Sequence, residues 1–189
     1  MKTIKTIAFT LLVAFGTTVS AQTTKKVDAS KSTINWVGKK VTGQHTGTIS
    51  LKDGALVFDG KKLVGGNFTV DMTSINTTDL KAGEGKEKLD GHLKADDFFG
   101  VEKHPTATLV FKSIGAKTKN SYKVNADLTI KGITEPITFD IVTVKNVATA
   151  KLAVNRTKYD IKYGSGSFFE GLGDKTISDN FDLEVNLKY

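Results

Sequence analysis

The sequence predicts an all-β fold, an antiparallel β-barrel of about eight strands, on three observations. Apolar and polar residues alternate with a period of two over most of the chain, so each predicted strand has one apolar face. Most connections between these segments are short and contain glycine. The chain offers one weak helix pattern, which cannot cover a sheet that is apolar on one face. The apolar faces must therefore cover one another, in a sandwich or, as the sequential hairpins favour, in a closed barrel.

The clearest strands form a hairpin over residues 122–142. Every second residue from Tyr122 onward is apolar, and the residues between them are polar. Gly132 supplies the freedom for a bend, and Pro136 is expected to start the return strand. The return alternates again from Ile137, so both arms of the hairpin expose one apolar face.

Other segments alternate in the same way or are rich in β-branched and aromatic residues, and they are expected to be strands: residues 33–41, 48–51, 55–58, 63–72, 106–114, 149–159 and 181–188. Asp53-Gly54 and Asp59-Gly60 are both signals for tight hairpin turns. Residues 75–105 and 163–178 break the alternation, and the first of these excursions contains a short predicted helix at residues 87–95.

Residues 1–21 are expected to be a cleaved secretory signal peptide. Two lysines precede an apolar run at residues 7–15, and Val19-Ser20-Ala21 provides small residues for cleavage. The apolar run is shorter than the about 20 residues that a membrane span needs. Residues 22–189 would then form one domain that is periplasmic or secreted. The chain contains no cysteine, so a lipoprotein anchor is excluded.

Composition narrows the function classes further. Without cysteine the chain has no disulfides, catalytic thiols or cysteine metal sites. Its net charge of +7 comes mainly from lysines scattered along the strands, a pattern typical of a solvated outer face and not of a nucleic-acid site. An outer-membrane barrel is disfavoured because such barrels turn their apolar face outward. We expect no nucleic acid partner and no stable membrane anchor.

Several motifs together resemble the YceI-like family of bacterial lipid- and polyisoprenoid-binding proteins. The matching stretches are residues 28–47 (DASKSTINWVGKKVTGQHTG), Ser74-Ile75 with Asp79-Leu80, residues 89–105 (LDGHLKADDFFGVEKHP), residues 128–136 (LTIKGITEP) and the segment around 155–160. The resemblance implies an extended lipocalin-like barrel that holds a long isoprenoid chain in its lumen, with a homodimer as a reasonable assembly. The chain departs from the family at Arg156 to Asp160, where the family often has Arg-Ser-Asp-Phe-Gly.

The strand alternation and the aromatic pairs of the two excursions then give a predicted set of lumen-lining residues. These are Phe68, Val70, Met72, Phe98, Phe99, Leu109, Phe111, Leu128, Ile130, Phe139, Ile141, Val154, Phe168 and Phe169. Of each adjacent phenylalanine pair, we expect one ring inside the barrel and one at its rim.

The polar candidates have both a functional and a structural interpretation. His45, His92 and Arg156 could contact a ligand head group. For His92 a hydrogen-bonded structural role is favoured, and for Arg156 an ion pair that holds the following loop is an equal alternative. The three histidines match no zinc spacing, so no metal is predicted. Helix capping explains the aspartates near residue 96 better than acid–base catalysis does.

The sequence therefore predicts a non-catalytic exported protein without a cofactor, which sequesters, transports or stores an isoprenoid-type lipid. The alternative is a stress-response or structural interaction domain without a small ligand.

Overall fold

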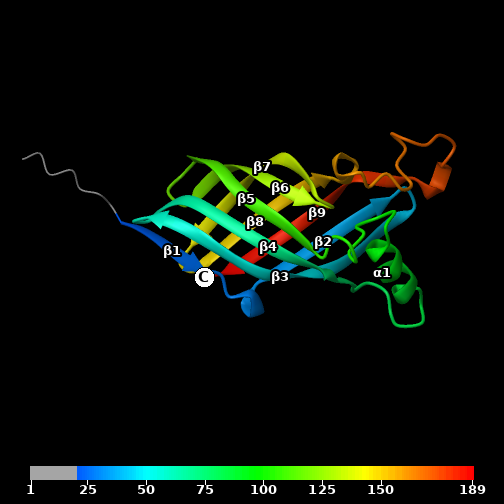
Figure 1. The fold of residues 1–189 in the computed structure, drawn as a ribbon, viewed down its shortest axis with the longest axis horizontal. Coiled ribbons are helices and arrows are strands. Elements are labelled where there is room, and N and C mark those ends of the chain that lie inside the picture. Colours follow the sequence, from blue (N-terminus) through cyan, green and yellow to red (C-terminus); the bar gives the residue numbers. More distant parts are fainter. Residues whose placement is uncertain (1–20) are drawn as a thin grey trace, which may run out of the picture.

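The computed structural model describes residues 21–189, and the predicted signal peptide lies outside the described residues except for Ala21. The chain forms an elongated, closed antiparallel barrel of eight strands with one additional strand and one short α-helix (Figure 1). The strands are β1 (Gln22–Lys26), β2 (Thr33–Lys40), β3 (Gly43–Asp59), β4 (Lys62–Thr77), β5 (Thr106–Ala116), β6 (Ser121–Ile130), β7 (Ile133–Val144), β8 (Val147–Asn155) and β9 (Ile177–Lys188). The predicted barrel is confirmed.

The barrel closes because both ends of the strand order meet on β3. Neighbouring strands run β3-β2-β9-β8-β7-β6-β5-β4, and β4 then pairs with β3. β1 and β2 lie end to end along the other edge of β3: β1 pairs with residues 55–59 and β2 with residues 43–49. Closure leaves each of the eight strands hydrogen-bonded on both edges, which removes the exposed edge of an open sheet.

The predicted central hairpin is confirmed as β6 and β7, joined by a two-residue turn. Lys131 and Gly132 have φ values of 52° and 75°, as a type I′ turn requires. Ile130 therefore pairs with Ile133, and the return strand begins there. Pro136 lies within β7 opposite Asp127, so the expectation that it starts the return is wrong.

The expected hairpin turn at Asp53-Gly54 is wrong. Asp53-Gly54 is not a turn, because β3 runs without interruption from Gly43 to Asp59 and absorbs the irregularity as shifts in its pairing with β4. Gly54 is needed for space: a Cβ there would lie 2.5 Å from the Phe68 ring. The second signal does mark a turn, since Gly60 has a φ of 58° between β3 and β4.

One additional strand and one strand end also differ from the sequence prediction. β1 has the sequence QTTKK, which carries no apolar alternation and was not predicted. β8 ends at Asn155, and the residues expected to continue it form a 3₁₀ turn, η2 (Arg156–Tyr159), with Asn155 as its N-cap. The predicted helix is present as α1 (Lys86–Lys94), and two further 3₁₀ turns are η1 (Ala29–Lys31) and η3 (Gly173–Lys175).

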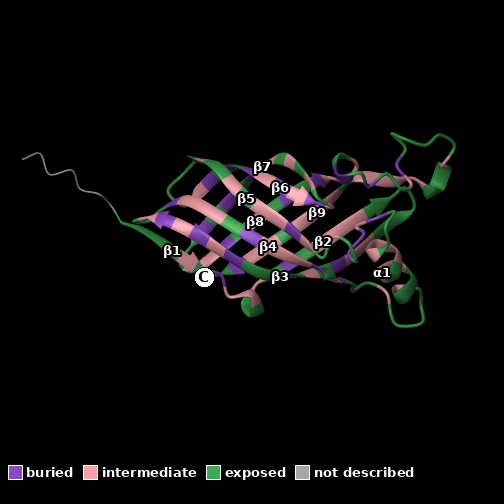
Figure 2. Cartoon of the chain, in the orientation of Figure 1, coloured by how far each residue is buried: buried purple, intermediate pink, exposed green. Residues whose placement is uncertain are grey.

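The end of the barrel beside the C-terminus is filled with side chains. Leu56, Leu63, Val124 and Ala148 are completely buried there. The rings of Phe58 and Tyr189 stack with centroids 5.4 Å apart. Exposed residues gather in the loops at the opposite end, beside α1 (Figure 2). The core therefore closes one end of the barrel, and the site lies toward the other.

Candidate functional site

A cavity of about 190 Å³ occupies the barrel between the packed end and α1. Each of the strands β2 to β9 contributes at least two side chains to its wall, and the surface that faces the cavity is apolar. Its lining is Ile34, Trp36, Gly38, Lys39, Ile49, Leu51, Phe68, Val70, Met72, Ile75, Leu93, Phe98, Phe99, Ala107, Leu109, Phe111, Leu128, Ile130, Phe139, Ile141, Ala150, Leu152, Arg156, Ile177, Ser178, Asn180, Phe181, Leu183, Val185 and Leu187.

Three aromatic rings form the inner part of the cavity wall, toward the packed end. The centroid of Phe111 lies 5.6 Å from that of Phe68 and 5.8 Å from that of Phe139. Gly66 on β4 leaves room for this arrangement, because a Cβ there would approach the Phe111 ring to 2.8 Å. These rings come from β4, β5 and β7, so the cavity depends on the register of three strands.

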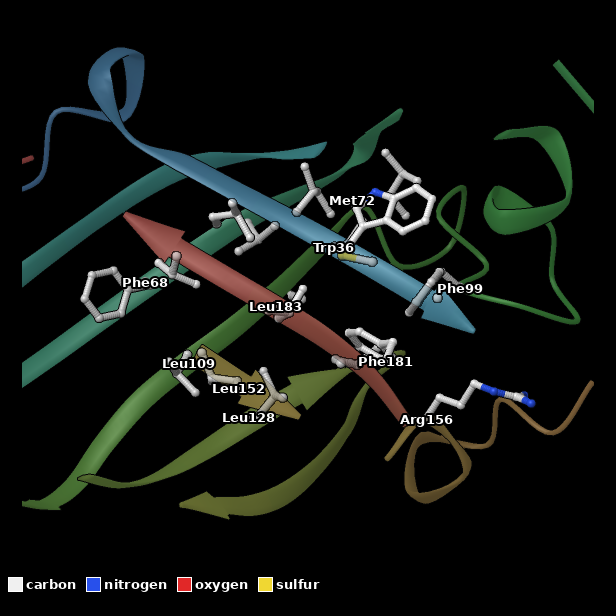
Figure 3. Close-up of a pocket in the computed structure, with 18 of the residues that line it drawn as sticks. Trp36, Phe68, Met72, Phe99, Leu109, Leu128, Leu152, Arg156, Phe181 and Leu183 are labelled. Atoms are coloured by element: carbon white, nitrogen blue, oxygen red, sulfur yellow. The ribbon is translucent and has the colours of Figure 1, made fainter. Parts of the chain in front are cut away.

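A second aromatic group covers the cavity at the α1 end. Phe98 and Phe99 meet edge to face with centroids 5.3 Å apart, and Phe99 meets Phe181 of β9 in the same way at 6.0 Å. Leu93 of α1 completes this cover. Figure 3 shows Phe99 and Phe181 near the same end of the pocket, with Phe68 at the other. The excursion over residues 75–105 thus supplies the cover of the cavity.

Polar residues enter the cavity wall in one place, which we call the mouth: Lys39, Arg156, Ser178 and Asn180. Pairing of β2 with β9 is irregular at this point, since Gly38 pairs with Phe181 but Lys40 pairs with Ile177. Lys39 and Asn180 are exposed, so the mouth connects the cavity wall with the surface of the protein. The Lys39 ammonium lies 2.6 Å from the Asp182 carboxylate.

Arg156 lines the mouth with its stem, but its guanidinium is occupied by the protein. Nε donates to the Ser178 carbonyl at 2.9 Å, Nη1 to that of Ile161 at 2.8 Å and Nη2 to that of Ile177 at 3.1 Å. Its side chain is 2% exposed, and Asp179 lies 3.9 Å from Nη2. In Figure 3 the guanidinium points away from the apolar side chains of the pocket. The geometry thus matches the structural interpretation, an anchor between η2 and β9.

Both candidate histidines are paired with aspartates outside the cavity wall. His45 Nδ1 lies 2.8 Å from a carboxylate oxygen of Asp79, which also accepts from the Thr46 amide. His92 Nε2 lies 3.2 Å from Asp97, and its ring packs edge to face on Phe98 and on Tyr163. Neither histidine lines the pocket. The structure thus places His45 as a contact between β3 and the loop at Asp79, and His92 as a contact of α1 with the turn at Asp97 and with Tyr163 of the second excursion.

Of the fourteen predicted lining residues, eleven lie in the cavity wall; Val154, Phe168 and Phe169 do not. Val154 points inward and is 1% exposed, but it lies outside the cavity wall. Phe168 and Phe169 are both about half exposed, so the expectation that one ring of this pair faces inward is wrong. Phe98 and Phe99 both line the cavity, so the same expectation is wrong there too.

The sequence prediction missed most of one wall of the cavity. Phe181, Leu183, Val185 and Leu187 of β9 line it, as does Trp36 of β2, whose indole N–H donates to the Thr48 carbonyl at 3.2 Å. Their alternation was visible in the sequence. What it could not show is that β2 and β9 are neighbours, because they lie at opposite ends of the chain.

Neither a metal site nor a membrane-spanning helix is found in the described part of the chain. Within residues 21–189 no three His, Cys, Asp or Glu side chains are grouped so that they could hold a metal ion. No helix of these residues combines the length and the apolar character that crossing a membrane requires.

The fold and the cavity define a class of protein: an antiparallel barrel that encloses an apolar site open at one mouth. Residues 26–189 match the YceI-like domain, and the chain belongs to this family. Among curated relatives it is 33% identical over 92 residues to a UPF0312 protein of Shewanella denitrificans and 42% identical over 73 residues to one of Staphylococcus aureus. These alignments cover 49% and 39% of this chain, and the chain spans less than half the length of either relative, 46% and 36%.

Two solved structures share the barrel. The crystal structure of Burkholderia cenocepacia BcnA aligns with a TM-score of 0.67 and 23% identity, over 85% of this chain and 98% of that one. The structure of a polyisoprenoid binding domain from Saccharophagus degradans aligns with a TM-score of 0.61 and 17% identity, over 86% and 95%. At these identities the likeness concerns the fold.

Proposed function

We propose that this protein binds one long apolar lipid of the isoprenoid class in the barrel cavity, without catalysing a reaction. The observation that carries the proposal is the cavity wall, which all eight barrel strands build from apolar side chains. A site of this kind binds by removing hydrocarbon from water, at about 0.8 kcal/mol for each buried CH₂. The polyisoprenoid binding domain that shares the fold supports the same class of ligand.

The inner wall offers a polar ligand nothing to bind. The two charged residues that line the cavity, Lys39 and Arg156, both lie at the mouth, and Arg156 directs its donors to three backbone carbonyls. A carboxylate or phosphate placed among Phe68, Phe111 and Phe139 would therefore be desolvated without a partner, which is costly. A polar end group belongs at the mouth, where Lys39 and Asn180 reach solvent.

The size of the cavity indicates how a long chain would fit. Its volume of about 190 Å³ exceeds the roughly 150 Å³ of an apolar protein cavity that binds benzene. A chain of several isoprene units is larger than benzene, so it must extend along the barrel and leave through the mouth or move the Phe98–Phe99 cover. Branched, unsaturated chains suit an irregular wall of aromatic and aliphatic side chains.

The protein acts in the periplasm or outside the cell, where an apolar lipid needs a carrier or store between membranes. This part of the proposal rests on the basic start, the short apolar run and the small-residue cleavage site of residues 1–21. N-terminal sequencing of the protein from its native host would find a start near Gln22 if the segment is cleaved.

A titration tests ligand binding. Delipidated protein is mixed with isoprenoid alcohols of increasing length, and the fluorescence of Trp36, the single tryptophan of the chain, reports on the cavity wall. We expect affinity to rise with each added isoprene unit until the cavity is filled, and then to level off. A short polar alcohol serves as the matched control. Equal fluorescence with every chain length would refute the proposal.

A further inference from the structure

We propose that the loop beside the mouth docks the protein on a lipid bilayer through Phe168 and Phe169. We call residues 163–176 the aromatic loop. This inference rests on the proposed function, because a ligand that fills an apolar cavity is held in membranes when it is not held by the protein. The loop extends beyond the end of the barrel next to α1 (Figure 1).

Apolar exposure is concentrated around this loop. Seven large hydrophobic side chains are exposed in the described residues, and four of them lie here: Val41 at 67%, Tyr163 at 47%, Phe168 at 51% and Phe169 at 50%. Val41 belongs to the neighbouring β2–β3 turn, and its amide donates to the Thr176 carbonyl at 3.1 Å. Single exposed apolar residues are ordinary, but a group of large ones marks an interaction site.

A network of hydrogen bonds, which we call the scaffold, holds the segment that carries the two phenylalanines. Ser165 is fully buried and donates to Oδ1 of Asp179 at 2.5 Å, while Ser167 donates to Oδ2 at the same distance. The amides of Phe168 and Phe169 both donate to the Ser165 carbonyl, at 3.1 and 3.0 Å. With these hydrogen bonds in place both rings are about half exposed. Their exposure is thus a property of the fold.

The scaffold joins the aromatic loop to the mouth of the cavity. Asp179, which holds the two serines, lies 3.9 Å from the guanidinium of Arg156. The Ile177 amide donates to the Gly164 carbonyl at 2.8 Å, and both Ile177 and Ser178 line the cavity. A lipid that passes the mouth therefore leaves the protein beside the exposed rings.

The chemistry of the patch suits the interface of a bilayer. Aromatic rings with an adjacent cation are typical of surfaces that lie between water and hydrocarbon. The Lys162 ammonium lies 5.1 Å from the centroid of the Phe168 ring, where it can stay hydrated while the ring enters the membrane. Without Lys2 and Lys5 of the predicted signal peptide, the chain keeps 25 Lys and Arg against 20 Asp and Glu, and this net charge of +5 favours approach to an anionic lipid surface.

Vesicle flotation tests the inference. Purified protein is mixed with vesicles of phosphatidylethanolamine and phosphatidylglycerol in equal parts, and the floated fraction is compared for wild type and the variant Phe168→Ser/Phe169→Ser. The matched control is Val142→Ser/Val144→Ser, which removes exposed apolar side chains (39% and 49%) from strand β7 and leaves the aromatic loop unchanged. We expect the partition coefficient to fall by about tenfold or more in the aromatic variant, since two half-exposed rings are lost, and to stay unchanged in the control.

Two further readouts separate this inference from the proposed function. Lipid extracted from the purified variants is expected to equal that of wild type, because Phe168 and Phe169 do not line the cavity. A Phe168→Trp variant is expected to shift its emission to shorter wavelength when vesicles are added. The inference is overturned if the aromatic variant floats like wild type, or if wild type does not float. It is also overturned if high salt alone abolishes binding, or if the rings instead mediate self-association in sedimentation experiments. In each of these cases lipid in the cavity would still support the proposed function.

Discussion

Two alanines on one face of β8 distinguish the cavity from the packed end. Ala148 is completely buried and does not line the cavity, whereas Ala150 does. The substitutions Ala148→Leu and Ala150→Leu add the same atoms two residues apart, and both side chains point into the barrel. The two variants are therefore expected to differ in stability and in lipid content.

The magnitudes follow from the surroundings of each alanine. Leucine at position 148 must displace close-packed neighbours, and overpacking of this kind costs about 1–3 kcal/mol. Leucine at position 150 enters the cavity, where its added carbons are buried without displacement and contribute on the order of 1–2 kcal/mol. We therefore expect the free energies of unfolding of the delipidated variants to differ by roughly 2–5 kcal/mol, with Ala150→Leu the more stable.

Urea denaturation of delipidated protein measures the first difference, and uptake of an isoprenoid alcohol measures the second. We expect Ala150→Leu to bind the alcohol at least about tenfold more weakly than wild type, because the added side chain occupies ligand space and 1.4 kcal/mol corresponds to a factor of ten. Ala148→Leu, once folded, should bind like wild type. Equal destabilisation by both substitutions, or undiminished binding by Ala150→Leu, would refute the reasoning.

Three further predictions concern stability. Arg156→Met leaves three carbonyls and Asp179 without their partner, so the free energy of unfolding should fall by about 3–5 kcal/mol in urea denaturation; a loss near zero would contradict the anchoring role. Burial raises the pKa of Tyr159 to about 12, whereas an unfolded tyrosine has its ordinary pKa near 10. The stabilisation that Tyr159 contributes in its protonated form is therefore fully present below pH 10 and is lost as the pH rises toward 12. Unfolding curves of Tyr159→Phe should show less of this alkaline loss. Gly47→Ala should destabilise the protein by about 2 kcal/mol or more, because the added Cβ would lie 2.2 Å from the Asn76 carbonyl oxygen. Gly91→Ala in α1 should stabilise it by about 0.5–1 kcal/mol, because no atom lies within 4 Å of the added Cβ. Thermal melts that rank the two variants the other way would contradict the packing.

The sequence predicts the barrel well because alternation determines which face of a strand is buried. This holds for β6 and β7, where both arms and the bend at Gly132 are confirmed. The prediction fails where a strand carries no alternation: β1 is polar throughout and is held by backbone pairing with β3. It also fails at Gly54, where glycine serves packing against Phe68 and a turn was expected.

The site is harder to predict than the fold, for a geometric reason. Alternation shows that Val154 and Phe139 both point inward, but it does not show how far along the barrel each one lies. Phe139 reaches the cavity wall, while Val154 does not. Aromatic pairs outside strands carry no periodicity at all, so nothing in the residues distinguishes the inward pair at Phe98 from the exposed pair at Phe168.

The central claim is that the cavity holds an apolar lipid, and native mass spectrometry of protein purified from its host tests it most directly. The account predicts a mass above that of the polypeptide by one lipid per barrel, and the release of an isoprenoid-type molecule on collisional activation. Ala150→Leu should carry less of it, and Phe168→Ser/Phe169→Ser should carry as much as wild type. Polypeptide mass alone, both as purified and after incubation with isoprenoid-containing vesicles, would contradict the account.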